Sequence, residues 1–350
     1  MVVPRLADIV GHAARVEALR DALRRNRVAH AFLLEGPDGV GKHAVAKGFA
    51  SALLCSNPVD GDACGECPAC IKVAIDSHPD LHRVEANDKD NILLDSLRAV
   101  EQVIHLRAME GGRKVVLIDG AERMKAPVQN ALLKTLEEPP AATHLVLVTG
   151  RPRALLPTIA SRCQRLIFGS LRPEEVERVL SRASPELSRE ARKGLARIAD
   201  GSPGRALALD YDALRERQAQ VIALDRALDP DAPRALNAAL ERSSALAKEQ
   251  RPTLGELLDT WTSWSRDQVL HLVGQPIVHF DRAEELAELA DHRGLDVCLH
   301  RTEALLEARR QLDLPFNLNP QVVLEQLGLT LVGAVPLRRL PFVPDASRAQ

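Results

Sequence analysis

The stretch Gly36-Pro-Asp-Gly-Val-Gly41-Lys42-His43 follows a short apolar run, Ala31–Glu35, and opens a helical pattern. A strand, a glycine-rich loop and a helix in this order form a P-loop, in which backbone N–H groups converge on a phosphate and a lysine reaches the β- and γ-phosphate oxygens. The glycine and lysine spacing fits this motif and predicts a nucleotide site in an α/β domain. Its candidate binding residues are Gly36, Gly39, Gly41, Lys42 and His43.

Outward from the loop, the first half of the chain alternates short apolar runs with helical stretches, which is typical of a parallel sheet covered on both faces. One of these stretches, Pro127–Glu138, predicts a helix that starts at a proline, has apolar residues along one face and ends before Pro139. Besides Ala31–Glu35, the predicted strands are Leu81–Glu85, Lys114–Asp119, His144–Thr149 and Arg165–Phe168.

Two positions depart from the pattern of a nucleotide-hydrolysing P-loop. Such a loop has Ser or Thr after the lysine, whose hydroxyl holds Mg²⁺, whereas this chain has His43, a poor ligand for that hard cation. The strand that ends at Asp119 is followed by Gly120, where ATPases of this architecture usually have a glutamate that orients the attacking water. Three interpretations remain open: a turn that binds an anion weakly or not at all, nucleotide binding without turnover, and active hydrolysis.

Four cysteines lie close together as Cys55-x8-Cys64-x2-Cys67-x2-Cys70. Four thiolates with Gly and Pro turns between them can fold onto one tetrahedral ion, and four protein ligands leave no open position for a catalytic water. We therefore expect a structural zinc site. Two adventitious disulfides or free thiols are the alternatives.

The composition excludes several classes of protein. With 350 residues, 45% hydrophobic and 27% charged, the chain is long enough for two or three domains with sizeable cores. A formal net charge of -2 argues against a protein that coats nucleic acid through bulk positive charge, and 3% aromatic residues argue against a row of base-stacking platforms. The N-terminus has no signal-peptide pattern and no long apolar run occurs, so we expect a cytoplasmic protein.

The strand pattern ends near Ser170, and the sequence beyond it is helical. Breaks at Ser184-Pro185 and at Gly201–Gly204 mark a small helical unit, which an Ala-, Leu- and Arg-rich region with helical spacing follows. We expect an α/β plus all-α chain in four parts: an α/β domain at 1–170 with the cysteine motif at 55–70, a small helical domain at 171–212, a larger helical domain at 213–330 and a loose tail at 331–350.

Several longer motifs resemble the clamp-loader branch of the AAA+ proteins, and the resemblance spans nearly the whole chain. The gamma/tau motor subunits of that branch carry Thr after the P-loop lysine and Asp-Glu at the end of the third strand, so His43 and Gly120 resemble the non-hydrolysing subunits instead. The motifs that carry the resemblance are Asp8–His12, His30–Pro37, the four-cysteine motif, His78–His82, Asn130–Pro140 and Ser161–Gln164.

The resemblance implies a RecA-like AAA+ domain with a zinc module, a helical lid and a C-terminal collar through which subunits assemble. Arg162 would be an arginine finger, inserted in trans at the ATP of an adjacent gamma/tau subunit, where it stabilises charge during phosphoryl transfer. Arg205 matches the sensor position of the second domain. With Asp119 and Thr149 it completes the degenerate nucleotide site, at which binding of ATP is an open question.

As a whole, the resemblance implies a component of the DNA polymerase III holoenzyme with no polymerase or ATPase activity of its own. It would join gamma/tau and delta subunits in a hetero-pentamer and help to load the sliding clamp onto primed DNA. One alternative is a self-sufficient AAA+ ATPase or a gamma/tau-like motor, in which His43 and Glu122 replace the usual residues. Another is a zinc-dependent adaptor that has no part in ATP chemistry.

Overall fold

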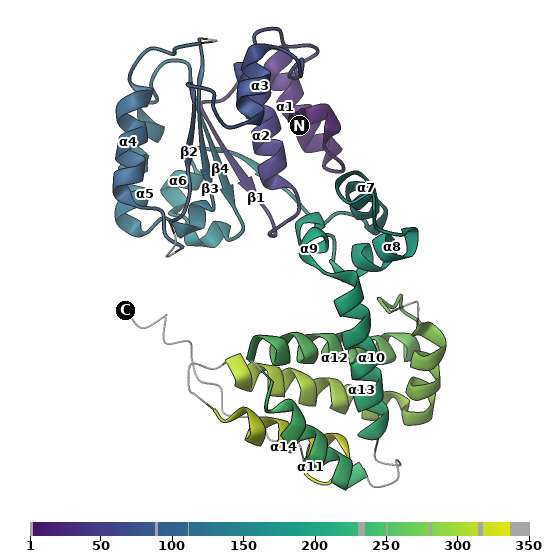
Figure 1. Ribbon diagram of the computed structural model, residues 1–350. Helices are drawn as coiled ribbons and strands as arrows, with labels where there is room; N and C mark the ends of the chain where they lie inside the picture. Colours follow the sequence, from purple (N-terminus) through teal and green to yellow (C-terminus); the bar gives the residue numbers. More distant parts are fainter. Residues whose placement is uncertain are drawn as a thin grey trace. The chain divides into compact units, whose positions relative to one another are not determined.

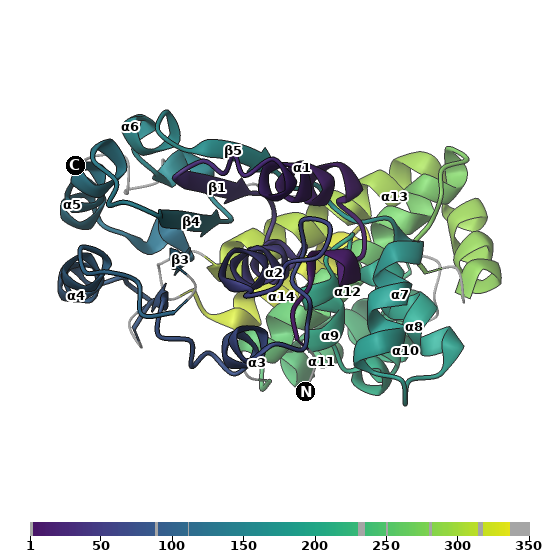
Figure 2. The same ribbon diagram turned by 90° about the horizontal axis from the view of Figure 1, so that it is seen from above.

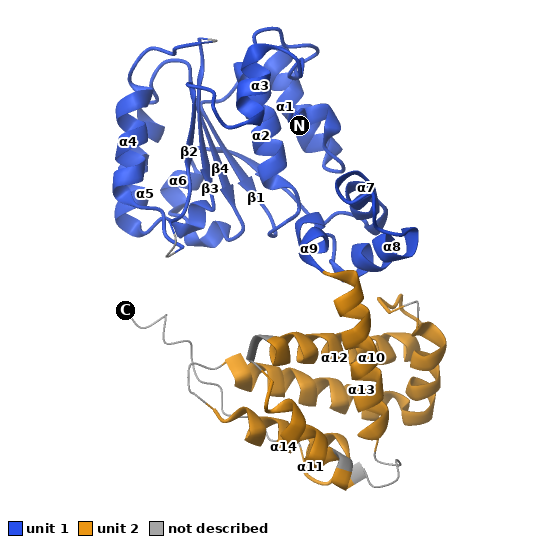
Figure 3. Cartoon of the chain, viewed as in Figure 1, with its two compact units in different colours: residues 1–209 blue, residues 210–350 orange. Residues whose placement is uncertain are grey.

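The fold is described from a computed structural model, which covers residues 3–87, 90–110, 112–229, 235–249, 251–279, 282–313 and 318–336. The chain divides into two compact units, residues 1–209 (unit 1) and 210–350 (unit 2), which Figure 3 shows in different colours. All strands found in the described residues belong to unit 1, and the described elements of unit 2 are helices. The predicted combination of an α/β part and an all-α part is therefore confirmed.

Unit 1 is built on a five-stranded parallel sheet in the order β2-β3-β4-β1-β5; Figure 1 labels β1 to β4, and Figure 2 shows β5 beside β1. In the register on either side of β1, Phe32 lies between Val146 of β4 and Gln164 of the edge strand β5. All predicted strands are present, and their bounds differ from the prediction by at most one residue. The strands are β1 Ala31–Glu35, β2 Leu81–Val84, β3 Lys114–Asp119, β4 Thr143–Thr149 and β5 Gln164–Ile167.

Helices cover both faces of this sheet, because successive side chains of each strand point to opposite sides. Phe32 of β1 packs against Phe49 of α2 with ring centroids 5.0 Å apart, whereas Leu33 belongs to the core formed with α4, α5 and α6. Figures 1 and 2 accordingly show α2 and α3 on one face and α4 and α5 on the other. The helix predicted at Pro127–Glu138 is confirmed as α5, one residue earlier.

The helices of unit 1, including the 3-10 turns η1 to η3, follow in chain order. They are η1 Leu6–Asp8, α1 Ala13–Arg24, α2 Lys42–Leu54, α3 Pro68–Ala74, α4 Leu94–Ile104, η2 Ala121–Arg123, α5 Ala126–Glu137, η3 Pro152–Ala154, α6 Pro157–Ala160, α7 Pro173–Ala183, α8 Arg189–Ile198 and α9 Pro203–Ala208.

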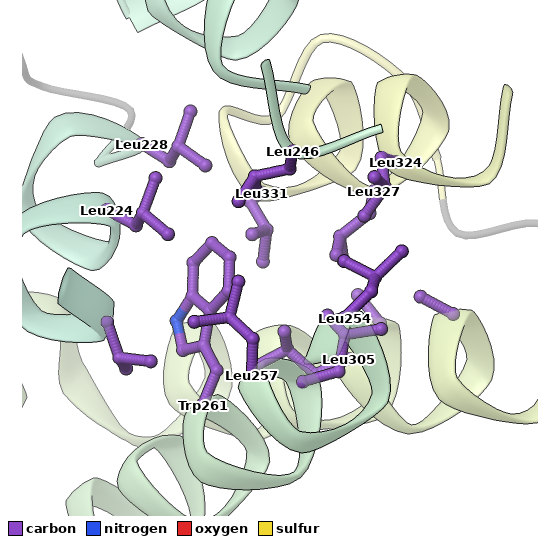
Figure 4. Packing of buried hydrophobic residues seen from close by; sticks show 14 of the residues in the cluster. Leu224, Leu228, Leu246, Leu254, Leu257, Trp261, Leu305, Leu324, Leu327 and Leu331 are labelled. Atoms are coloured by element: carbon purple, nitrogen blue, oxygen red, sulfur yellow. The ribbon is translucent and has the colours of Figure 1, made fainter. Parts of the chain in front are cut away.

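Unit 2 is a helical bundle around a leucine-rich core, part of which Figure 4 shows from close by. Trp261 lies among the leucines of this core, and it and Trp264 are at most 1% exposed. The helices are α10 Tyr211–Ala227, α11 Ala235–Leu246, α12 Arg251–Leu272, α13 Ala283–Asp313 and α14 Pro320–Leu331, with α13 interrupted at Gly294, which has φ +75°.

A buried ionic network ties the helices of unit 2 together around Asp225 of α10, which is fully buried. Its carboxylate accepts hydrogen bonds from Trp261 and Trp264 (3.0 and 3.2 Å) and lies 2.6 and 2.7 Å from the guanidinium groups of Arg293 and Arg301. Buried charges need such partners, since an unpaired charge in the interior is very unfavourable. The network therefore fixes α10, α12 and α13 against one another.

The division of the chain beyond residue 170 stays a prediction. Helices α7, α8 and α9, which fall in the helical part predicted at 171–212, belong to the same compact unit as the sheet. Most of the predicted tail at 331–350 lies outside the described residues, which end at 336. No helix in the described ranges combines the length and the apolar character that crossing a membrane would require.

Candidate functional site

A cavity of about 830 Å³ lies in unit 1 at the carboxyl ends of β3 and β4, where ligands bind in open α/β sheets. The P-loop, α7, the start of α9 and the N-terminal segment complete its wall. Of the candidate nucleotide-binding residues, the cavity is lined by Gly39, Gly41, Lys42, His43, Asp119 and Thr149. Gly36 and Arg205, the other two candidates, are not among its lining residues, and nucleotide binding at the P-loop stays a prediction.

Two glycines of the loop are required by close contacts. A Cβ on Gly36 would stand 2.2 Å from the carbonyl oxygen of Phe168, which follows β5. A Cβ on Gly39, where φ is +74°, would stand 2.3 Å from the hydroxyl of Ser202. Real side chains cannot approach that closely, so the loop packs against both neighbours only because glycine has no Cβ.

The loop is also bonded to the start of α9. The Ser202 hydroxyl donates to the carbonyl of Asp38 (2.9 Å), and the Gly204 amide donates to the carbonyl of Gly39 (2.8 Å). Arg205, which sequence similarity assigned to the nucleotide site, has an exposed side chain and does not line the cavity, whereas Gly204 does. In this structure, the start of α9 thus meets the P-loop through backbone groups and a hydroxyl.

Lys42 is 5% exposed and turns back onto its own loop. Its ammonium group donates to the carbonyls of Gly36 and Pro37, both at 2.6 Å, and lies 3.6 Å from the carboxylate of Asp38. Burial lowers the pKa of Lys42, against the opposing effect of Asp38 and other nearby acids. The lysine that would bind phosphate is therefore already engaged by oxygen atoms of the protein.

His43 and Asp119 occupy the two positions that hold Mg²⁺ in a hydrolysing site, and they contact each other. The imidazole Nδ1 lies 2.9 Å from the carboxylate Oδ2. The adjacent His43 imidazole holds the pKa of Asp119 below its ordinary value, with burial opposing it. A carboxylate paired with an imidazole, where a hydrolysing loop has a hydroxyl, is a poor site for a hard cation that requires oxygen ligands.

The position that orients water is also altered. Gly120 has φ +67°, and Glu122 directs its carboxylate to the backbone amide of Gly150, which donates a hydrogen bond of 3.3 Å. Glu122 lines the cavity but is used in this contact at the end of β4. The geometry therefore offers no glutamate in the usual place after the third strand.

The apolar part of the cavity was not identified from the sequence. Ile9 and Val10 of the N-terminal segment face it together with Val179 of α7 and Leu207 of α9. These side chains come from segments far apart in the sequence, and each fits an ordinary amphipathic pattern. The only local signal was the motif Asp8–His12, which carried part of the family resemblance without showing what it contacts.

Arg162 is not among the residues that line the cavity of its own chain, and it follows α6 by two residues. Its guanidinium group is 2.7 Å from the carboxylate of Glu137 and donates to the carbonyl of Thr158 at 3.0 Å. The side chain is 36% exposed. The half-exposed side chain is thus held by a carboxylate and a backbone carbonyl of its own chain.

The four cysteines of the motif form one cluster at the C-terminal end of α2 and the start of α3. Their sulfur atoms all lie within 4.8 Å of one another, with 3.5 Å between Cys55 and Cys64 and 3.9 Å between Cys64 and Cys70. These separations are too long for disulfides, whose sulfurs are about 2.05 Å apart. They match the spacing of about 3.8 Å between the corners of a tetrahedron with Zn–S bonds of about 2.3 Å.

Backbone amides support negative charge on this cluster. The amide of Cys64 donates to the sulfur of Cys55 (3.3 Å), and that of Cys70 donates to the sulfur of Cys67 (3.5 Å). Burial alone would raise the pKa of the Cys67 thiol, but backbone hydrogen bonds from Cys70 and Ser56, with the thiols of Cys70 and Cys64, outweigh it and lower the pKa to about 6. Burial raises the pKa of the Cys55 and Cys70 thiols, so the stabilised thiolate is that of Cys67. A set of four sulfur donors with a stabilised thiolate suits a soft or borderline metal ion.

Comparison with known proteins gives consistent matches. A family model described as "DNA polymerase III, delta subunit" matches residues 11–172. DNA polymerase III subunit delta' of Pseudomonas aeruginosa is 34% identical over 87% of this chain and 92% of its own length. Subunit tau/gamma of Haemophilus influenzae is 32% identical over 61% of this chain and 32% of its own length. Among solved structures, a DNA polymerase III gamma-subunit-related protein of Thermotoga maritima covers 91% of this chain and 98% of its own, with a TM-score of 0.41 and 18% identity.

Proposed function

Because the chain belongs to the family of DNA polymerase III delta' subunits, we propose that it helps to load the sliding clamp onto primed DNA without hydrolysing ATP itself. The observation that carries the second half of this proposal is the contact between His43 and Asp119. Phosphoryl transfer in P-loop enzymes depends on a metal ion held by a hydroxyl and a carboxylate. Here the hydroxyl is missing and the carboxylate is taken up by the imidazole.

In this proposal the partners are gamma/tau and delta subunits in a hetero-pentamer, and the clamp and DNA are reached through that assembly. The similarity to tau/gamma subunits supports a common architecture, because the subunits of one ring must present matching surfaces to one another. Unit 1 would then be a RecA-like AAA+ domain with the lid formed by α7 to α9, and unit 2 would be the collar. The leucine-rich core and the ionic network make unit 2 a rigid support for such assembly.

Arg162 is proposed as the arginine finger of this subunit. Its partial exposure supports insertion at the ATP of an adjacent gamma/tau subunit, and it does not line the cavity of its own chain. There, the planar guanidinium group would stabilise the charge that develops on the transferred phosphoryl group. This chain would supply the guanidinium group of Arg162, and the adjacent gamma/tau subunit would supply the rest of the site for ATP hydrolysis.

Absence of turnover in the isolated chain is the first expected result. Purified chain should show no ATP hydrolysis beyond that of a Lys42→Ala variant, because the metal-binding positions bind each other. In a reconstituted loader with clamp and primed DNA, Lys42→Ala should leave stimulated turnover within about twofold of wild type. A steady-state assay of phosphate release measures both.

The alternative of a self-sufficient ATPase predicts the opposite outcome. Turnover by the chain alone that disappears in Lys42→Ala would show that His43 and Glu122 form a working site. It would replace the proposal of a non-hydrolysing subunit.

We also propose that Cys55, Cys64, Cys67 and Cys70 hold a structural zinc ion, which closes the loop between α2 and α3. The four-sulfur donor set supports zinc, and four protein ligands leave no position for substrate. The role of the ion would be to stabilise the fold of this module. Purified chain should therefore contain about one zinc per molecule, and Cys64→Ser should lose nearly all of it.

The control for this result is Cys163→Ser. Cys163 lies outside the cluster, and burial raises the pKa of its thiol to about 12, so it should bind no metal. Elemental analysis of both variants, purified without chelator, measures the zinc content. Zinc retained by Cys64→Ser, or lost from Cys163→Ser, would contradict the proposed ligands.

A further inference from the structure

The N-terminal segment Arg5–His12, which we call the strap, forms part of the apolar wall of the cavity. It contains the short turn η1, and its residues Asp8, Ile9 and Val10 line the cavity. A short turn of this kind has little stability of its own, because most of its backbone groups have no partner within it. The position of the strap must therefore be set by contacts with other elements.

Two such contacts lead to the walls of the cavity. The side chain of His12 lies 2.9 Å from the carbonyl of Val40 in the P-loop, through its Nε2 atom. The guanidinium group of Arg182 on α7 donates to the carbonyl of Asp8 at 2.9 Å. These contacts join the strap to the P-loop and to the helical part of unit 1.

A third contact leads to the four-cysteine centre. The carboxylate of Asp62 is 1% exposed and accepts hydrogen bonds from the amides of Leu6 (2.9 Å) and Ala7 (2.7 Å). These are the first amides of η1, which no bond within the turn can satisfy. An ionised side chain that accepts two amides is a strong anchor, and its loss leaves two amides without a partner.

Asp62 sits on the loop between Cys55 and Cys64, two residues before the second of them. The tip of this loop is a tight hairpin in which Val59 and Asp62 exchange backbone hydrogen bonds of 2.9 and 3.0 Å. Its base is closed where the sulfurs of Cys55 and Cys64 approach to 3.5 Å. The position of Asp62 therefore depends on whether the two ends of the loop are held together.

A neighbouring acid on the same hairpin has a different partner. Asp60 lies 2.6 Å from the guanidinium of Arg20 and 3.1 Å from that of Arg24, both on α1, and its side chain is 58% exposed. Asp60 has φ +49°, a conformation that Asn also adopts readily. Its replacement by Asn thus offers a matched control that changes the same hairpin without touching the strap.

We propose that Asp62 is the positioning residue through which the four-cysteine centre fixes the strap, and with it the apolar wall of the cavity. This inference rests on the metal site proposed above. It gives the cysteine module a task beyond its own folding, because a loop with separated cysteines cannot hold Asp62 against Leu6 and Ala7. The pocket and the metal module would then respond to each other, although they share no residue.

The test measures hydrogen exchange at the amides of Leu6 and Ala7 in the full chain, with the zinc content of each sample determined in parallel. We expect removal of zinc to speed exchange at both amides about tenfold. Asp62→Asn should have a similar effect with zinc bound, and removal of zinc from Asp62→Asn should add little more. Asp60→Asn should exchange like the wild type at these two amides.

Three results would overturn the inference. Unchanged exchange at Leu6 and Ala7 after removal of zinc would show that the strap is held independently of the cysteines. Equal acceleration in Asp60→Asn and Asp62→Asn would indicate general loosening of the hairpin. Absence of zinc in the elemental analysis would contradict the proposed metal site, on which the inference rests. That result would not affect the assignment of the chain as a clamp-loader subunit.

Discussion

Replacing Arg162 with alanine is expected to lower ATP turnover at the adjoining gamma/tau site by a factor of about 10³ or more. An arginine finger acts only on the charge of the transition state, so its removal reduces the rate of the chemical step rather than nucleotide binding. The measurement is single-turnover phosphate release by the reconstituted loader with clamp and primed DNA. In the Arg162→Ala loader, the amplitude of the fast phase of phosphate release should fall by the contribution of the one gamma/tau site that this chain adjoins.

The substitution should not disturb the fold of this chain. The side chain of Arg162 contacts only Glu137 and the carbonyl of Thr158 among the hydrogen bonds and ion pairs found in the described residues, and exposed ion pairs contribute at most about 1 kcal/mol. Arg153→Ala, which removes another exposed arginine of unit 1, is the matched control and should behave like the wild type. Unchanged fast-phase amplitude in Arg162→Ala would reduce the chain to an adaptor.

The second large effect is expected in unit 2. Asp225→Ala should lower the free energy of unfolding of this unit by about 3–5 kcal/mol, because it leaves Arg293 and Arg301 buried with their main counter-charge removed. It also leaves two indole N–H groups without their acceptor. Urea denaturation of the full chain, followed by far-ultraviolet circular dichroism, should show an earlier transition for the helical unit.

The same carboxylate predicts how this stability depends on pH. Burial would raise the pKa of Asp225, but the charges of Arg301 and Arg293 outweigh burial and hold the pKa well below its ordinary value. A lowered folded-state pKa means that the contribution is complete above about pH 4, the ordinary value for an aspartate, and is lost only as the pH falls further. The network should therefore persist through mildly acidic conditions.

Asp259→Ala is the control for this prediction. Asp259 also forms an ion pair in unit 2, 2.8 Å from Arg309, but its side chain is 59% exposed. Its loss should cost at most about 1 kcal/mol. Similar destabilisation by both substitutions would show that burial of the Asp225 network is not what stabilises the unit.

The three central strands, β1, β3 and β4, were predicted closely because each is a mostly apolar run, a signal contained within the run itself. Their ends moved by one residue where pairing decides them: Thr143 joins β4 because it lies opposite Lys114 of β3. The helix α5 starts at Ala126 rather than Pro127, since a proline fits either of the first helical positions. Such shifts depend on neighbours that the local sequence does not contain.

The candidate site was predictable only where its residues are contiguous. The P-loop and the cysteines could be read from their spacing, and His43 and Gly120 were each recognised as departures from a pattern. That His43 would contact Asp119 could not be read, since 76 positions separate them and the sheet brings them together. Asp62 carried no signal at all, because an aspartate in a turn is ordinary and its partners are backbone amides of a distant segment.

The location of the aromatic residues determines what the fluorescence of this protein can report. Trp261, Trp264 and Tyr211 are the only tryptophans and tyrosine of the chain, and all belong to unit 2. The unit that contains the P-loop, the strap and the cysteine cluster has no such residue. A change in intrinsic tryptophan emission after a ligand enters the cavity of unit 1 would therefore report a change in the surroundings of the tryptophans in unit 2. The natural chain thus carries a built-in reporter of communication between its two units.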